Sequence, residues 1–250
     1  MMESEEKPKE IILNNNFTCP LIGIGTSHMK NEADVIYQSI RDGTRLIDTA
    51  SKYQNEEEVG KGIKKAIEDD IVKREDLFVV TKCWITEKED PEKALRNSLV
   101  RLQLDYVDLY LDHWPSGKCY GGREPFELVS MKDMWPKMEN LVQQGLTRSI
   151  GVSNYNVQNL LIILSLCKIK PVVNEVEFHP YLYQEDLKEF CDKLDIKEPK
   201  KEEESSCCGS SNNKKEKKDK KDNKPKMRET LETIKSVGSK DNVSEISGTK

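Results

Sequence analysis

Short apolar runs alternate along the chain with longer segments in which apolar residues recur three and four positions apart. Short runs rich in β-forming residues are typical of strands, whereas the second spacing buries one face of a helix. The predicted strands are Leu21–Thr26, Arg45–Ala50, Leu77–Trp84, Val107–Trp114, Arg148–Asn154 and Val172–His179. The predicted helices are Ala33–Asp42, Glu57–Glu68, Pro91–Leu102, Ser130–Gln144, Val157–Cys167 and Gln184–Leu194.

This alternation of strands and helices indicates a parallel α/β sheet, either open and doubly wound or closed as a (β/α)8 TIM barrel. Polar side chains stand near the C-terminal end of one strand after another, namely Asp48, Lys82, His113, Asn154 and Glu175. All strand C-termini of a barrel open onto one face, where active sites are built. An open sheet binds its ligand at one switch point, usually beside a glycine-rich turn. Gly23 and Gly25 lack the third glycine of such a turn, so the pattern favours the barrel.

The two ends of the chain differ from the barrel-like part. Residues 11–19 contain Asn14, Asn15 and Asn16 between apolar flanks, which predicts a hairpin that plugs the bottom of the barrel. About six βα units follow, so residues 11–196 are predicted to form one incomplete barrel domain without strands seven and eight. Residues 197–250 have almost no apolar side chains and are predicted to be a disordered, low-complexity charged tail.

Composition and charge exclude several classes of function. The formal net charge of -5 gives no general attraction to nucleic acid. No run approaches the roughly 18 apolar residues of a membrane span, and the polar, acidic N-terminus does not resemble a secretory signal. Seven cysteines and three histidines are scattered without the spacing of a disulfide framework or a metal site. This predicts free thiols, a cytoplasmic protein and no bound metal.

Three residues at the ends of neighbouring predicted strands suggest acid–base chemistry. Asp48 ends an apolar strand, and a buried carboxylate is costly unless it is paired. Lys82 ends the next strand and is its natural partner, while Tyr53 follows closely enough to lie beside the same ammonium group. A cation within about 4–6 Å favours the phenolate, so we expect the pKa of Tyr53 to fall below its ordinary value of about 10.

His113, on the following strand, is placed to donate a hydrogen bond to a carbonyl oxygen and orient it. Together with Tyr53 it suits the protonation of an oxygen as a carbonyl becomes an alcohol. No metal is needed, but the hydride must come from a cofactor because no side chain supplies one. Each residue alone has a structural interpretation, as an ion pair, a rim tyrosine or a hydrogen-bonded histidine. Their occurrence at successive strand ends favours catalysis.

From about residue 11 to residue 196 the chain resembles the aldo-keto reductase family. The motifs that carry the resemblance are Gly43–Ala50 with Glu56 and Val59-Gly60, Thr81-Lys82, Asp112–Pro115, Leu146–Tyr155 and Asn174–Tyr181. The resemblance implies a monomeric TIM barrel that reduces aldehyde or ketone groups of small molecules to alcohols with a hydride from NADPH.

The resemblance also implies roles for individual residues. Tyr53 would be the proton donor, Lys82 with Asp48 would lower its pKa, and His113 would orient the substrate. Ser153 and Asn154 match residues that hold the nicotinamide carboxamide. The whole cofactor site implied in this way contains Gly25, Thr26, Asp48, Ser153, Asn154 and Glu175. The implied substrate site contains His113, Trp84 and Trp114.

Three positions depart from the family pattern. Thr44 replaces an aromatic residue, and Ser27 stands where many members have a tryptophan that lines the substrate pocket. Glu175 replaces the usual glutamine, which also contacts the carboxamide. A glutamate at this position loses the amide donor and adds a negative charge.

A second hypothesis is a catalytically inactive, truncated homologue that acts as a binding or membrane-associated interaction protein. Six strands leave two open edges, and the portion expected after Ile196 would complete the cofactor site. Three explanations stay open: a fragment or mis-spliced gene model, a genuine truncated homologue, or an insertion before a missing C-terminal portion. Cys207 and Cys208 precede the lysine-rich segment Lys214–Arg228, which is either a solvated disordered segment or part of an acylated membrane anchor.

Overall fold

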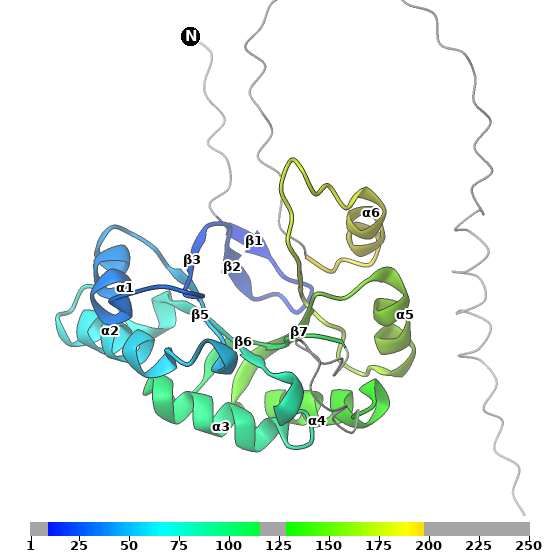
Figure 1. Ribbon diagram of the computed structural model, residues 1–250, viewed down its shortest axis with the longest axis horizontal. Helices are drawn as coiled ribbons and strands as arrows, with labels where there is room; N and C mark the ends of the chain where they lie inside the picture. The colour runs from blue at the N-terminus through cyan, green and yellow to red at the C-terminus, as the bar shows by residue number, and fades with distance from the viewer. Residues whose placement is uncertain (1–9, 116–128, 198–250) are drawn as a thin grey trace, which may run out of the picture. The chain divides into compact units, whose positions relative to one another are not determined.

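Six parallel strands form the central sheet and follow one another in the order in which they occur along the chain (Figure 1). They are β3 (Gly23–Gly25), β4 (Leu46–Asp48), β5 (Phe78–Cys83), β6 (Val107–Asp112), β7 (Thr147–Ser153) and β8 (Asn174–Glu175). An open doubly wound sheet reverses its strand order at a switch point, whereas a barrel does not. The sheet curls as half of a barrel, which confirms the predicted incomplete TIM-barrel fold.

This description comes from a computed structural model and covers residues 10–115 and 129–197. The described residues all belong to the first of two units of the chain, Met1–Lys201. The predicted charged tail from residue 198 onward, including Cys207, Cys208 and Lys214–Arg228, lies outside the described residues.

Six helices connect or follow the strands, and each lies within two residues of its predicted position. They are α1 (Glu32–Arg41), α2 (Glu56–Glu68), α3 (Pro91–Leu102), α4 (Met131–Gln143), α5 (Val157–Leu166) and α6 (Glu185–Lys193). Local chemistry explains where several of them begin. The side chains of Asp90, Ser130 and Asn156 accept hydrogen bonds from the first turns of α3, α4 and α5. Pro91 stands at the first position of α3, where no backbone N–H is needed.

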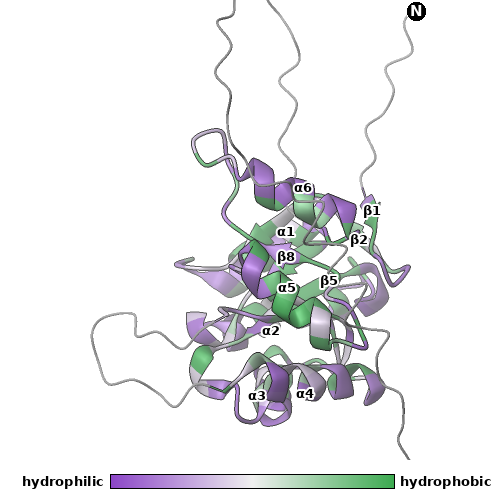
Figure 2. Ribbon diagram, turned by 90° about the vertical axis from the view of Figure 1, so that its right-hand side faces the viewer, coloured by the Kyte–Doolittle hydropathy of each residue, from purple (hydrophilic) through white to green (hydrophobic). Residues whose placement is uncertain are grey.

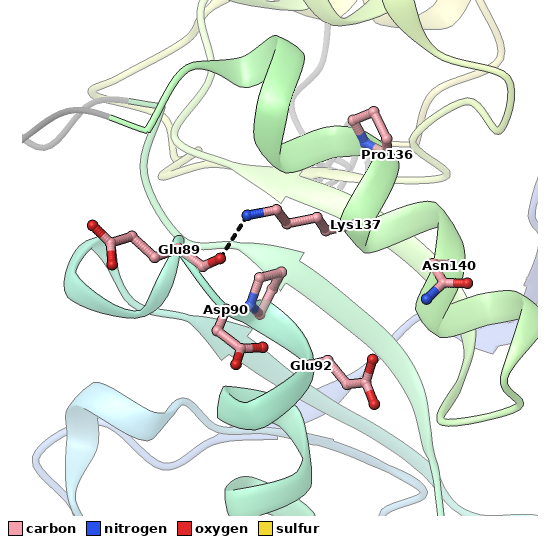
Figure 3. A pocket seen from close by; sticks show the side chains of 7 residues that line it. Glu89, Asp90, Glu92, Pro136, Lys137 and Asn140 are labelled. Carbon is pink, nitrogen blue, oxygen red and sulfur yellow. Dashed lines mark hydrogen bonds between the residues drawn. The ribbon is translucent and has the colours of Figure 1, made fainter.

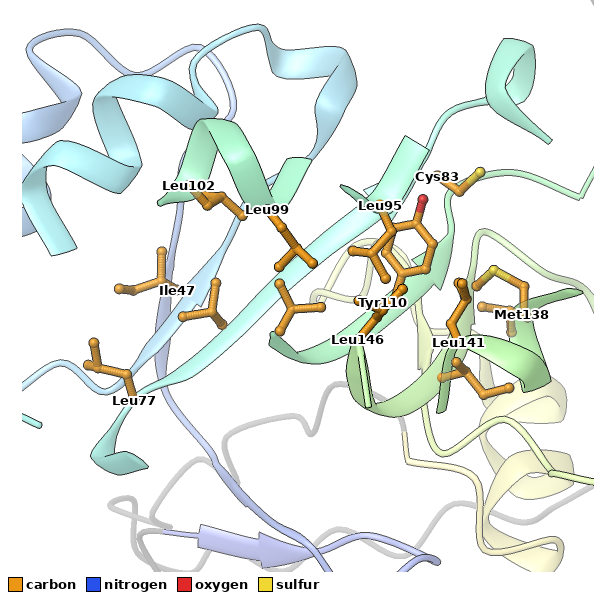
Figure 4. Close-up of a cluster of buried hydrophobic side chains, with 14 of the residues drawn as sticks. Ile47, Leu77, Cys83, Leu95, Leu99, Leu102, Tyr110, Met138, Leu141 and Leu146 are labelled. Carbon is orange, nitrogen blue, oxygen red and sulfur yellow. The ribbon is translucent and has the colours of Figure 1, made fainter. Parts of the chain in front are cut away.

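Strands β5 and β6 are buried on both faces, so the sheet has two apolar layers. The outer face packs against the helices through a large cluster that includes Ile47, Tyr110 and Leu95 (Figure 4). The inner face carries a smaller cluster with Phe78 and Leu109. Figure 2 shows the matching pattern of hydropathy, with hydrophobic strands inside and hydrophilic stretches on α3 and α4.

The predicted N-terminal hairpin is present as β1 (Glu10–Ile12) and β2 (Thr18–Pro20), which pair antiparallel. Leu13 and Cys19 pack into the inner apolar cluster of the sheet. The Asn15 amide donates to Ser149 Oγ at 2.9 Å, near the N-terminal end of β7. The Asn14 amide donates to Pro171 O at 3.0 Å, just before β8. The hairpin therefore closes the bottom of the half-barrel, as expected.

The last part of the sheet differs from the sequence prediction. Only Asn174–Glu175 of the predicted strand Val172–His179 forms a ladder, and Tyr181 beyond it is 98% exposed. Lys197, the first residue of the predicted tail, pairs in parallel with Val173, which directly precedes β8. Its N–H donates to Val172 O at 3.0 Å, and its carbonyl accepts from Asn174 N at 2.9 Å. Lys197 thus forms an isolated parallel bridge beside the start of β8.

Helices α2 and α3 approach each other closely at Gly60. A Cβ atom at this position would lie 2.6 Å from Leu102 O and 2.7 Å from Arg101 O, which are backbone atoms with little room to move. We expect Gly60→Ala to lower the free energy of unfolding by roughly 1–3 kcal/mol, because overpacking outweighs the gain of about 1 kcal/mol in helix propensity. The midpoint of urea unfolding measures this change. Lys64→Ala, on the exposed face of the same helix, is the control, and equal stability of both variants would contradict the close approach.

Candidate active site

The residues of the predicted site that lie on strands, Asp48, Lys82 and Glu175, share the inner face of the sheet. Side chains alternate between the faces of a strand, so Lys82 points to the same side as Phe78 and Val80 of the inner cluster. Asp48 follows Leu46 of that cluster in the same way, and Glu175 follows Val173. Because all six strands run in parallel, their C-terminal ends bring these polar side chains to one rim of the half-barrel.

Lys82 is the centre of the site, and its side chain is fully buried. Its ammonium group donates hydrogen bonds to Asp48 Oδ1, to Thr49 O at 3.2 Å and to Tyr53 OH at 3.4 Å. It also lies 3.2 Å from Glu175 Oε1. A buried ammonium group needs such acceptors to replace water. The structure therefore brings Asp48, Tyr53 and Lys82 together as predicted and adds Glu175 to them.

The carboxylates keep Lys82 positively charged. Burial acts to lower the pKa of Lys82, but the charges of Asp48, Glu175 and Tyr53 outweigh burial and raise the pKa above its ordinary value. Burial raises the pKa of Asp48, although the Lys82 charge opposes this change. Burial and the Asp48 charge raise the pKa of Glu175 to about 7.

The pKa of Tyr53 moves in the direction opposite to our expectation. Burial raises it, and the charges of Asp48 and Glu175 raise it further, so Lys82 alone does not reverse the change. Tyr53 is therefore a phenol at neutral pH rather than a partly ionised group. The sequence prediction counted one carboxylate beside Lys82, whereas the site contains two.

His113 lies beside Tyr53 and is 7% exposed. Its ring stands edge-on to the Tyr53 ring with 5.8 Å between centroids, and edge-on to Trp84 with 5.1 Å. Burial and the Lys82 charge lower the pKa of His113 to about 4, so the imidazole is neutral near physiological pH. Its buried Nδ1 has no hydrogen-bond partner among the described residues. A neutral imidazole offers one donor and one acceptor.

Tyr53 and His113 border a cavity of about 620 Å³. Trp84 and Trp114 also line it, as the predicted substrate site requires, and Lys52 holds its ammonium group 5.0 Å from the Trp84 ring. A second cavity, of about 360 Å³, lies between the start of α3 and α4 (Figure 3). There the Lys137 ammonium donates to Glu89 O at 2.6 Å, and none of the predicted catalytic residues lines the cavity.

The residues of the predicted cofactor site lie on both sides of Lys82. On one side, Gly25 pairs with Asp48 across β3 and β4, and Thr26 N donates to Asp48 O at 2.9 Å. On the other, Ser153 Oγ donates to the carbonyl of Glu175 at 3.0 Å. The Asn154 amide donates to His113 O at 3.0 Å, and Asn154 has a left-handed backbone with φ of 61°.

A buried network behind the site was not predicted from the sequence. Asp112 accepts hydrogen bonds from Lys88 Nζ at 2.8 Å and from Tyr155 OH at 2.7 Å, and Lys88 also donates to Trp114 O. These contacts fix the segment that carries His113. The only sequence signal was the position of Asp112 directly before His113, because the partners come from distant segments.

Several classes of site are not found in the part of the chain that the structure describes. No helix there is long and apolar enough to cross a membrane, and no group of three or more metal-ligating side chains occurs. Cys19, Cys83 and Cys167 are free thiols.

Known proteins are similar to this chain in sequence and in fold. The model of the Aldo/keto reductase family matches residues 22–247. The NADH-dependent D-xylose reductase of Candida parapsilosis is 41% identical over 203 residues, which cover 74% of this chain and 63% of that protein. Aldose reductase C of Dictyostelium discoideum is 39% identical over 204 residues, which cover 74% and 64%.

A solved structure is also similar. The crystal structure of an aldo-keto reductase of Bombyx mori in complex with NADP matches with a TM-score of 0.71 and 38% sequence identity. The match covers 76% of this chain and 64% of that protein. The chain thus spans less than two thirds of the length of these relatives.

Proposed function

Because this chain belongs to the aldo/keto reductase family, we propose that it reduces aldehyde or ketone groups of small molecules to alcohols with a hydride from NADPH. The observation that carries the proposal is the arrangement of Tyr53, Lys82 and His113 at one rim of the half-barrel. Tyr53 OH is 3.4 Å from the buried ammonium group of Lys82, and its ring stands 5.8 Å from that of His113.

The residues around this rim fit a nicotinamide cofactor. Thr26 Oγ1 and His113 Nδ1 are buried and have no hydrogen-bond partner among the described residues. Buried polar atoms of this kind are costly unless a bound molecule or water satisfies them. Ser153, Asn154 and Glu175 would hold the carboxamide, and Gly25 leaves open space because an added Cβ atom would meet nothing within 4 Å. NADPH, when bound, supplies the hydride.

The protein side chains orient the carbonyl group and supply the proton. The neutral His113 ring donates a hydrogen bond to the carbonyl oxygen and holds it beside Tyr53. The phenol of Tyr53 then gives its proton to that oxygen as the oxygen gains negative charge. Lys82 stabilises the phenolate that this step leaves, and Trp84 and Trp114 form walls of the substrate cavity.

The proposal is tested by mixing the purified full chain with NADPH and para-nitrobenzaldehyde while the near-ultraviolet absorbance of NADPH is followed. We expect saturable oxidation of NADPH that depends on the aldehyde. Fluorescence titration with NADPH in the absence of aldehyde measures cofactor binding separately. Binding without turnover would contradict the reductase function and would instead favour an inactive binding protein.

A further inference from the structure

Glu175 gives Lys82 a second carboxylate partner. Its Oε1 atom lies 3.2 Å from the Lys82 ammonium group, which also donates a hydrogen bond to Asp48 Oδ1. The two carboxylate side chains are 36% and 25% exposed, whereas that of Lys82 is fully buried. Two carboxylates thus approach one buried cation.

The curl of the sheet creates this contact. Strands in a flat sheet lie about 4.8 Å apart, so the three intervals from β5 to β8 would separate Lys82 from Glu175 by roughly 14 Å. In the half-barrel the inner faces of these strands turn toward each other, and the carboxylate of Glu175 reaches the ammonium group.

The charges around Glu175 do not balance when both carboxylates are ionised. The charges that act on it are those of Asp48 from β4 and Lys82 from β5, and its own charge acts on Tyr53 from the turn after β4. The Lys82 charge also acts on His113, which follows β6. Among the described residues, Lys82 is the only lysine or arginine within 4.0 Å of either carboxylate. Two close carboxylates that share one cation favour the binding of one proton by the pair.

We propose that Asp48 and Glu175 share one proton across Lys82, and that Glu175 thereby acts on Tyr53 through Lys82, so that the Lys82 charge is available to Tyr53 only while the pair holds this proton. This inference rests on the proposed reductase function. While the proton is shared, the positive charge of Lys82 offsets a single carboxylate charge and the phenolate of Tyr53 is tolerated. When the pair loses the proton, two carboxylates repel the phenolate, and Tyr53 gives up its own proton less readily.

The proposal predicts the direction of the pH dependence. In the step itself, the O–H bond of Tyr53 breaks and the O–H bond of the alcohol forms, while the shared proton stays on the carboxylate pair. Reduction should therefore be fast below the titration of the pair and slow above it. The pKa of Glu175 of about 7 places the change between about pH 6 and pH 8, with a fall of up to about tenfold per pH unit above the midpoint.

The test compares Glu175→Gln with the wild-type chain, because glutamine keeps the size of the side chain but does not titrate. We expect kcat of the wild type to fall from about pH 6 to pH 8, and kcat of the variant to be flat over this interval. Glu177→Gln is the matched control, since the Glu177 side chain is exposed and pairs with His179 rather than with Lys82, so this variant is expected to keep the wild-type profile. Profiles that coincide for the wild type and Glu175→Gln would overturn the proposal.

A second measurement needs no activity. Carboxyl carbon chemical shifts of the ligand-free chain, followed by NMR against pH, report the titration of the pair directly. The shared proton is supported if the wild type shows a titration near neutral pH that is lost in Glu175→Gln and kept in Glu177→Gln. The shared proton is ruled out if the wild type shows no such titration. If no chain reduces an aldehyde but this titration is present, the reductase function fails while the shared proton stands.

Discussion

Tyr53→Phe is expected to lower kcat for aldehyde reduction by about 10²–10⁴-fold, which is the usual contribution of a general acid. The substitution removes only the hydroxyl group that lies 3.4 Å from Lys82. The ring remains, so its edge-on contact with His113 and the wall of the cavity are preserved. Affinity for NADPH, measured by fluorescence titration, should stay close to that of the wild type.

Tyr37→Phe provides a matched control for this experiment. The exposed hydroxyl of Tyr37 donates to Asp69 at 2.8 Å, and neither residue lines the cavity. Loss of that hydroxyl should leave kcat unchanged. A Tyr53→Phe variant that retains more than about a tenth of wild-type turnover would show that another group donates the proton.

Local sequence signals were sufficient for most elements of the fold. The prediction of α3 matches its observed bounds because Asp90 caps it, Pro91 begins it and Gln103 ends it in a left-handed conformation. Strand β8 was predicted too long, because Val172–His179 has an apolar pattern but only Asn174–Glu175 finds a partner strand. The alternation of residues shows that a segment is able to form a strand. Whether it does depends on a neighbour far away in the sequence.

The site was predictable as far as adjacent strands decide it. Asp48 and Lys82 meet because their strands are neighbours and run in parallel. The approach of Glu175 to Lys82 was not predictable, since it depends on the curvature of the sheet across three strand intervals. The rise in the pKa of Tyr53 comes mainly from burial, which strand order does not give, and the second carboxylate adds to it. The ends of neighbouring strands therefore identify the residues of the site. They do not give the sum of the charges that act on each residue.

Lys82→Met is expected to abolish reduction and also to destabilise the fold, which separates it from Tyr53→Phe. Methionine fills a similar volume but leaves Asp48 and Glu175 without the cation that both contact. Loss of one partner of a buried ion pair costs about 3–5 kcal/mol when the remaining charge is not compensated. Urea unfolding near neutral pH should show that Lys82→Met lowers the free energy of unfolding by an amount of this order. Lys64→Met, which replaces an exposed lysine, should lower it less.

The dependence of this loss on pH identifies its cause. Without Lys82, burial and mutual repulsion hold the pKa of Asp48 and Glu175 above their values in the unfolded chain. The folded variant then binds more protons than the unfolded one, so its stability falls as pH rises through the folded-state titration. Adding Asp48→Asn to Lys82→Met removes one buried charge and should restore part of the stability without restoring turnover. A Lys82→Met chain whose stability does not change with pH would show that Lys82 acts by filling space, and that the two carboxylates do not depend on its charge.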